Sequence, residues 1–241
     1  VVLSSFSGNT EETLAAAEEA AARGAALLAV TTGGQLAEHA GRHGYPLWQF
    51  DYRAQPRAAL GWSFGLLLGL VHRLGYMPSL ETDVPAAIEQ LRAQRPEYTA
   101  SQPAATNPAK RGAGQLMGRI PMIIGAGPSG TVARRWKGQL NENANAWAQW
   151  EGMPEMNHNA VVGISNPEDL LRHTCMIFIA SEAYDHPRVA LRHRLTYTLC
   201  LEHGIMADRF EPRGPSLLAQ MLHAIQYGDY LSYYTAIGYG V

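Results

Sequence analysis

Hydroxyl groups and a glycine gather near the start of the chain, where an apolar segment gives way to a helix-forming one. The segment Ser4–Thr10 follows the apolar residues Val1–Leu3 and precedes an acidic, alanine-rich stretch. The free N–H groups and the dipole of a helix N-terminus favour an anion. Hydroxyls add hydrogen bonds without a permanent charge, and the segment lacks the lysine of a P-loop. This pattern predicts a phosphate-monoester site, with simple helix capping by Ser and Thr as the alternative.

A second glycine-rich turn, Gly125–Gly130, follows a predicted strand and satisfies the spacing G-x-G-x-x-G. A dinucleotide site of this type needs a second strand that ends in an acid about 20 residues further on. Residues 134–156 instead favour a polar helix followed by a loop. We therefore expect a tight strand-to-helix turn, and a bound dinucleotide would support the alternative.

Two residues of the C-terminal half could transfer protons. Glu142 lies between two asparagines on a predicted helix, and their carboxamides could hold its carboxylate in one rotamer. His158 lies in a polar loop, where an imidazole can exchange protons near neutral pH. A solvated helix face and a surface histidine are the corresponding structural interpretations.

The elements that must position these residues alternate between strand and helix. Strands are predicted at residues 1–3, 25–30, 47–50, 120–124, 176–180 and 205–210. Helices are predicted at residues 10–24, 35–44, 56–74, 84–95, 131–150, 187–203 and 216–237. This alternation indicates an α/β fold with parallel sheets, which bind ligands beyond the carboxyl ends of their strands.

One stretch of the chain lacks the hydrophobic periodicity of helices and strands, and it divides the chain into two parts. Residues 96–114 are rich in Pro, Ala, Thr, Ser and Gly, which is typical of a linker. We predict an N-terminal domain over residues 1–100, a linker over residues 101–114 and a C-terminal domain over residues 115–241. Because the chain starts directly with an apolar strand, we expect the first domain to be truncated at its N-terminus.

The composition argues against several functional classes. A net charge of −2 over 241 residues gives no basic stripe, so no nucleic-acid partner is expected. Cys175 and Cys200 lack zinc or disulfide spacing, which favours a reducing, cytoplasmic location. The apolar run Ala58–Val71 is shorter than the about 20 residues that cross a bilayer, and it predicts a buried helix with no membrane association.

Four separated motifs resemble one known family. The first, Ser5–Thr13, is similar to the phosphate loop of sugar isomerase (SIS) domains, and Gln55–Leu60, Arg135–Ala144 and Pro154–Asn159 resemble the bifunctional phosphoglucose/phosphomannose isomerases of that superfamily. The resemblance implies two doubly wound SIS-like domains with parallel sheets. It also implies that Ser5, Ser7 and Thr10 contact the substrate phosphate. Many members have tyrosine at the position of Phe6, so secondary contacts at this ring differ.

The resemblance also implies a reaction, the interconversion of glucose 6-phosphate or mannose 6-phosphate with fructose 6-phosphate through a cis-enediol. No cofactor and no metal are expected. Glu142 is expected to move the proton between C1 and C2, and His158 to assist ring opening from the neighbouring subunit of a homodimer. Arg57 is expected to face the enediolate, and its alternative is a surface charge paired with an acid.

Two other functions remain open from the sequence. A non-catalytic SIS module could bind a phosphosugar with the same phosphate loop and use Glu142 and His158 structurally. Another SIS isomerase or the synthase half of an amidotransferase would also share the loop. The presence of both Asn141–Asn143 and Asn157–Asn159 favours the hexose-phosphate isomerases.

Overall fold

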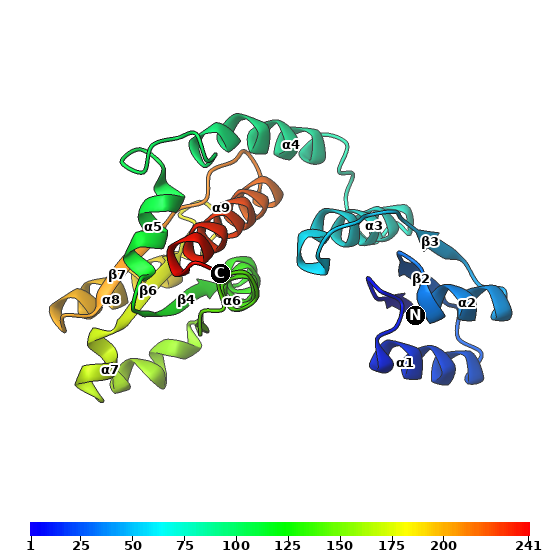
Figure 1. Cartoon of the computed structure of the whole chain (residues 1–241), viewed down its shortest axis with the longest axis horizontal. Helices are drawn as coiled ribbons and strands as arrows, with labels where there is room; N and C mark the ends of the chain where they lie inside the picture. Colours follow the sequence, from blue (N-terminus) through cyan, green and yellow to red (C-terminus); the bar gives the residue numbers. More distant parts are fainter. The chain divides into compact units, whose positions relative to one another are not determined.

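The computed structural model of the protein describes residues 1–241, which form two compact units, Val1–Leu80 and Glu81–Val241. Each unit contains its own parallel sheet, so the predicted α/β class is confirmed (Figure 1). The units divide earlier than the predicted boundary at residue 100. Helix α4 (Asp83–Gln94) belongs to the second unit because it packs against α9 (Leu217–Tyr239).

The first unit is built on a three-stranded sheet in the order β1-β2-β3. The strands are Val2–Ser4, Leu28–Thr31 and Leu47–Gln49, and all pairs are parallel. Helices α1 (Glu11–Ala22) and α2 (Gly34–His43) connect them. Both crossovers step in the same direction along the sheet, so right-handed connections place both helices on one face.

Small side chains let α1 pack closely in this unit. Ala17 and Ala20 on α1 are buried in one cluster with Leu3, Ala29 and Leu36 from the strands and α2. The alanine-rich composition therefore serves close helix packing as well as helix propensity.

The apolar run after β3 forms the short 3-10 helix η1 (Pro56–Ala58) and helix α3 (Leu60–Arg73). The prediction of a helix is confirmed, but the prediction that it is buried is wrong, because no residue of α3 is buried. Within the first unit α3 packs chiefly against η1, its neighbour in sequence, and a helix buries an apolar face only against another element. None of the protein's helices combines the length and the apolar composition needed to cross a bilayer.

The second unit has a four-stranded parallel sheet in the order β5-β4-β6-β7. Its strands are β4 (Ile120–Ala126), β5 (Gln149–Met153), β6 (Thr174–Ile179) and β7 (Met206–Phe210). The connecting elements are α6 (Pro128–Ala144), η3 (Glu155–Asn157), η4 (Ala160–Gly163), α7 (Glu168–Arg172) and α8 (Pro187–Glu202). The chain moves from β4 to β5 on one side and then to β6 on the other, so this sheet is doubly wound with its switch point between β4 and β6.

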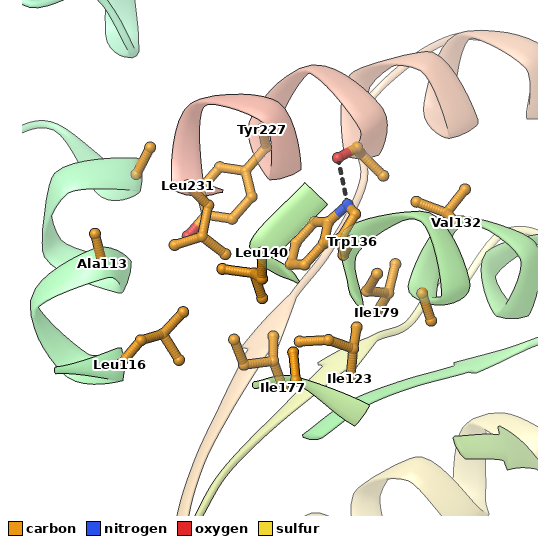
Figure 2. Packing of buried hydrophobic residues seen from close by; sticks show 14 of the residues in the cluster. Ala113, Leu116, Ile123, Val132, Trp136, Leu140, Ile177, Ile179, Tyr227 and Leu231 are labelled. Atoms are coloured by element: carbon orange, nitrogen blue, oxygen red, sulfur yellow. Dashed lines mark hydrogen bonds between the residues drawn. The ribbon is translucent and has the colours of Figure 1, made fainter. Parts of the chain in front are cut away.

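Residues of β4 alternate between two cores. Ile123 packs with α5 (Pro108–Leu116), α6 and α9, whereas Ile124 faces the cluster on the other side of the sheet. Figure 2 shows the first of these clusters around Trp136, whose indole N–H donates to the carbonyl of Ala224 at 2.8 Å. The period of two along the strand thus produces two helical layers around one buried sheet.

Two segments differ from their predictions. Within residues 101–114, predicted as a linker, the structure begins helix α5, which follows η2 (Arg95–Glu97) and several turns. The Asn107 side chain caps α5 by accepting from the N–H groups of Ala109 and Lys110 at 3.0 and 3.1 Å. Strand β5 occupies residues predicted as helix and loop, because pairing with β4 outweighs the local polarity of the sequence.

Candidate functional site

The loop between β1 and α1 brings together the three predicted phosphate-binding residues. The hydroxyl oxygens of Ser5 and Thr10 lie 2.7 Å apart, and the Gly8 N–H donates to Ser5 Oγ at 3.1 Å. Ser7 Oγ accepts from the Asn9 N–H at 3.2 Å. Ser5 is buried at the base of the loop, whereas Ser7 and Thr10 are exposed. The loop therefore presents hydroxyls to solvent from a fixed backbone.

Thr10 does not act as a conventional helix cap. It occupies the N-cap position of α1, but its side chain makes no capping hydrogen bond and pairs with Ser5 instead. The first turn of a helix leaves its N–H groups without intrahelical partners. Thr10 therefore does not cap α1 through its side chain, as the alternative interpretation required. The N-terminus of α1 can receive an anion.

A second loop, which the sequence analysis missed, holds the first in place. The Thr32 backbone N–H and hydroxyl both donate to the Phe6 carbonyl, at 3.0 and 2.7 Å. The Gln35 N–H donates to Asn9 Oδ1 at 3.1 Å. The segment Thr31–Gly34 lies at the carboxyl end of β2, as the phosphate loop lies at the carboxyl end of β1. This repeated turn of small polar residues is the sequence signal that could have identified it.

Arg57 also lies in the first unit. It is partly buried in η1, immediately before α3. Phe6 of the phosphate loop meets Phe50 edge-on with ring centroids 6.1 Å apart, and Phe50 stacks on Trp62 of α3 at 5.4 Å. This aromatic series links the phosphate loop to the helix that follows Arg57.

Glu142 is exposed in the last turn of α6. The asparagines on either side anchor that helix end. Asn141 donates to the Ala146 carbonyl at 2.7 Å, and Asn143 donates to Ser232 Oγ on α9 at 2.9 Å. The carboxamides thus fix the backbone that carries the carboxylate.

An ion pair between α6 and α9 adds to this anchoring. Arg135 Nη2 donates to both carboxylate oxygens of Asp229, at 3.0 and 3.1 Å, and Gln139 donates to the same group at 2.8 Å. Burial raises the pKa of Asp229, while Arg135 and Gln139 oppose that shift. This partly buried cluster sets the position of α6 relative to α9 within the second unit.

His158 is exposed at the end of η3, and its backbone is firmly held. Its N–H donates to the Glu155 carbonyl at 2.8 Å. The preceding Asn157 donates to Thr196 Oγ1 at 2.7 Å, and Met156 is buried. The imidazole therefore projects from a rigid turn.

The structure does not bring Glu142 and His158 to one end of the sheet. Helix α6 starts beyond the carboxyl end of β4 and returns toward the start of β5, whereas η3 follows the carboxyl end of β5. The five residues of β5 span about 16 Å at 3.3 Å each. Within one chain the two side chains lie toward opposite ends of this strand.

The glycine-rich turn after β4 is closed. Ser129 Oγ accepts from the Ala126 N–H at 2.9 Å and donates to the Ala126 carbonyl at 2.8 Å. A Cβ added at Gly125 would lie 2.3 Å from the Ser129 carbonyl oxygen, so this glycine allows close packing. The expected tight turn is confirmed.

The expectation that no second strand follows this turn is wrong, since β5 pairs with β4 and supplies that strand. The enclosed space beside this turn is small. The cavity that Pro128, Ser129 and Tyr184 help to line holds only about 20 Å³, roughly the space of one water.

Comparisons with known proteins bear on the family and the fold of the chain. Residues 105–241 match the family described as "Bacterial phospho-glucose isomerase C-terminal SIS domain". The chain is 38% identical over 240 residues to the bifunctional phosphoglucose/phosphomannose isomerase of Caldicellulosiruptor bescii, covering 99% of this chain and 70% of the relative. The enzyme of the same name from Aquifex aeolicus is 32% identical, with 98% and 69% covered.

A solved structure supports the fold. The glucose-6-phosphate isomerase like protein from Thermus thermophilus superposes with a TM-score of 0.64 at 16% identity, covering 100% of this chain and 82% of that one. At this identity the likeness concerns the fold alone. The matched family and the extent of the sequence identity establish that the chain belongs to the bifunctional phosphoglucose/phosphomannose isomerase family.

Proposed function

We propose that the protein is an aldose-ketose isomerase that interconverts glucose 6-phosphate or mannose 6-phosphate with fructose 6-phosphate. The observation that carries this proposal is the phosphate loop, in which Ser5, Ser7 and Thr10 are held by backbone and side-chain hydrogen bonds at a helix N-terminus. Relatives of the same family bear the name of this activity. Neutral hydroxyls can bind the phosphate dianion and still release the product.

Glu142 is the proposed acid–base residue. An aldose-ketose isomerisation removes a proton from one carbon and returns it to the neighbouring carbon, so a single carboxylate can serve as base and then as acid. In the forward step the carboxylate takes the C2 proton of the aldose, which leaves a cis-enediolate with its negative charge on O1. The proton of the C2 hydroxyl then passes to O1. Return of the proton to C1 gives the ketose. The anchoring of α6 by Asn141 and Asn143 supports this role.

Arg57 is proposed to stabilise the negative charge that develops on the enediolate oxygens. A guanidinium keeps its charge at any physiological pH, so it can stabilise an oxyanion without competing for the transferred proton. Its partial burial before α3 and the aromatic series that begins at Phe6 support a fixed position.

His158 is proposed to assist ring opening by moving a proton between the ring oxygen and the C1 hydroxyl. We infer that it acts on the substrate of a neighbouring subunit in a homodimer. The support for this is topological, because Glu142 and His158 lie toward opposite ends of β5 within one chain. The reaction needs no cofactor, since the hydrogen leaves and returns as a proton.

The test is an isomerase assay of the protein with fructose 6-phosphate, in which glucose 6-phosphate and mannose 6-phosphate are measured separately. Glu142→Gln keeps the size of the side chain and removes its basicity, so both products should fall by about 10²- to 10⁴-fold. The control is Glu202→Gln, which changes an exposed carboxylate at the end of α8. Equal activity of wild type and Glu142→Gln would refute the role of Glu142.

A mixed dimer tests the role of His158. Glu142→Gln and His158→Gln are each expected to be inactive, and mixing them should restore about a quarter to a half of the activity per site if the two residues act across the interface. No recovery in a confirmed mixed dimer would place both residues in one chain's site. Binding of fructose 6-phosphate without turnover by a folded wild-type dimer would favour the phosphosugar-binding module.

A further inference from the structure

A carboxylate and two imidazoles converge between α1 and α2. Glu18 lies on α1, and His39 and His43 lie one turn apart on α2, with one ligand atom of each within 4.8 Å of the other two. We propose that Glu18, His39 and His43 bind a divalent transition-metal ion of the zinc type that ties α1 to α2. This site is separate from the proposed isomerase chemistry.

His39 supplies the strongest support. It is only 1% exposed, yet its Nε2 atom has no hydrogen-bond partner. That nitrogen points toward Glu18, whose Oε1 lies 3.4 Å away. An unpaired polar atom in a buried position is costly, so a partner between Nε2 and the carboxylate would stabilise this arrangement.

Tyr45 contacts the other nitrogen of the His39 ring. The His39 Nδ1 atom lies 2.9 Å from Tyr45 Oη. When Nδ1 carries the proton and donates to Tyr45, Nε2 presents a lone pair to the Glu18 carboxylate, and the two acceptors repel unless a cation lies between them. Metal-binding histidines commonly donate their second N–H in this way, which fixes the tautomer that coordinates.

The donor set fits zinc better than a hard cation. Two imidazole nitrogens and one carboxylate oxygen are usual zinc ligands, with bonds of about 2.0–2.2 Å and a water in the fourth position. Tetrahedral coordination at those lengths separates the ligand atoms by about 3.3 Å. Glu18 and His43 are exposed and can turn inward to reach that spacing, while the buried His39 stays fixed.

The site lies at the opposite edge of the sheet from the phosphate loop. Helix α2 starts after the carboxyl end of β2 and runs back toward the start of β3, so His39 and His43 lie near the amino ends of the strands. Glu18 is eight residues beyond Thr10, about 12 Å along α1. A metal here would cross-link two helices, and it would stabilise the first unit without contacting the substrate.

The full-length chain, stripped with a chelator, is titrated with Zn²⁺ and separately with Mg²⁺ by calorimetry and thermal unfolding. One Zn²⁺ per chain should bind and raise the unfolding temperature, whereas Mg²⁺ should do neither. Glu18→Gln and His43→Gln change exposed side chains and keep the fold, and each should weaken Zn²⁺ binding at least tenfold. His203→Gln is the matched control, because His203 is an exposed histidine near a helix end in the second unit.

A spectroscopic readout identifies the ligands directly. Zn²⁺ should shift the imidazole nitrogen resonances of His39 and His43 in side-chain ¹⁵N spectra, and the His203 resonances should stay unchanged. The proposal is overturned if Zn²⁺ does not bind, if His43→Gln binds it as tightly as wild type, or if His203→Gln loses as much affinity. Isomerase activity should be the same in wild type and His43→Gln, so failure of this proposal and failure of the isomerase proposal are distinguishable.

Discussion

Ser5 and Thr10 meet through their hydroxyl oxygens, 2.7 Å apart, across the turn that joins β1 to α1. Because Ser5 Oγ also accepts from the Gly8 N–H, the pair links the buried base of the loop to its exposed rim. The hydroxyls are thereby oriented before a ligand arrives. Preorganised donors of this kind bind an anion without a further cost in side-chain ordering.

Removing one of these hydroxyls should weaken phosphate binding. Hydrogen bonds to charged groups contribute about 1.5–3 kcal/mol, so Thr10→Val should raise KM for fructose 6-phosphate by roughly 10- to 150-fold. The kcat value should change far less, because the phosphate contacts are similar in the substrate and the transition state. Steady-state kinetics of the folded variant checks this, and an unchanged KM would remove Thr10 from the phosphate site.

Gly8→Ala should destabilise the protein by more than the left-handed backbone conformation of Gly8 alone would cost. Gly8 has a φ of 68°, and a Cβ there would lie 1.8 Å from the Gly33 carbonyl oxygen. Gly24 has a φ of 67° but no atom within 4 Å of its Cβ position, so Gly24→Ala reports the cost of the left-handed conformation by itself. That cost is about 1–2 kcal/mol, and Gly8→Ala should exceed it. Chemical denaturation of both variants provides the comparison, and equal losses of stability would contradict the close approach of the two loops.

Gly228→Ala should destabilise the second unit. A Cβ at Gly228 on α9 would lie 2.2 Å from the indole nitrogen of Trp136, which donates to the Ala224 carbonyl. Overpacking of this kind costs about 1–3 kcal/mol. Gly138→Ala on α6 is the control, because nothing lies within 4 Å of its Cβ position and alanine should stabilise the helix by up to about 1 kcal/mol. Urea unfolding should therefore shift in opposite directions, and a stabilised Gly228→Ala would disprove the contact.

The second unit should lose stability in mild acid through its buried histidines. Burial lowers the pKa of His193 to about 4, and that of His223 likewise to about 4, below the ordinary value of 6.5. As the pH falls from about 6.5 to 4, the unfolded chain takes up protons that the folded chain does not. Stability is therefore lost across this range, on the order of 3 kcal/mol for each histidine.

His193→Gln should flatten this pH dependence. The free energy of unfolding of wild type and variant is measured from pH 7 to pH 4, and their difference isolates the histidine because both proteins share the same carboxyl groups. The variant should lose less stability than wild type over the range. His203→Gln, an exposed control, should follow wild type. Parallel curves for wild type and His193→Gln would show that the pKa of His193 is the same in the folded and the unfolded protein.

The sequence by itself determined the class of fold, and it predicted the kind of site. Alternating apolar strands and amphipathic helices predicted parallel α/β units, since these periods reflect which faces must be buried. The candidate phosphate loop could be predicted because its hydroxyl groups lie close together in the chain. Local chemistry of this type needs no distant partner, and the positions of Ser5, Ser7 and Thr10 follow from one strand-to-helix turn.

Only the tertiary structure decided the features that depend on contacts between distant segments. Strand β5 forms because its backbone pairs with that of β4, although the residues of β5 by themselves favour a helix and a loop. The loop Thr31–Gly34 holds the phosphate loop through contacts across some 25 residues, which no short motif records. The burial of His39 beside Glu18 likewise arises from packing α1 against α2, since burial is a property of the assembled elements and not of any one of them.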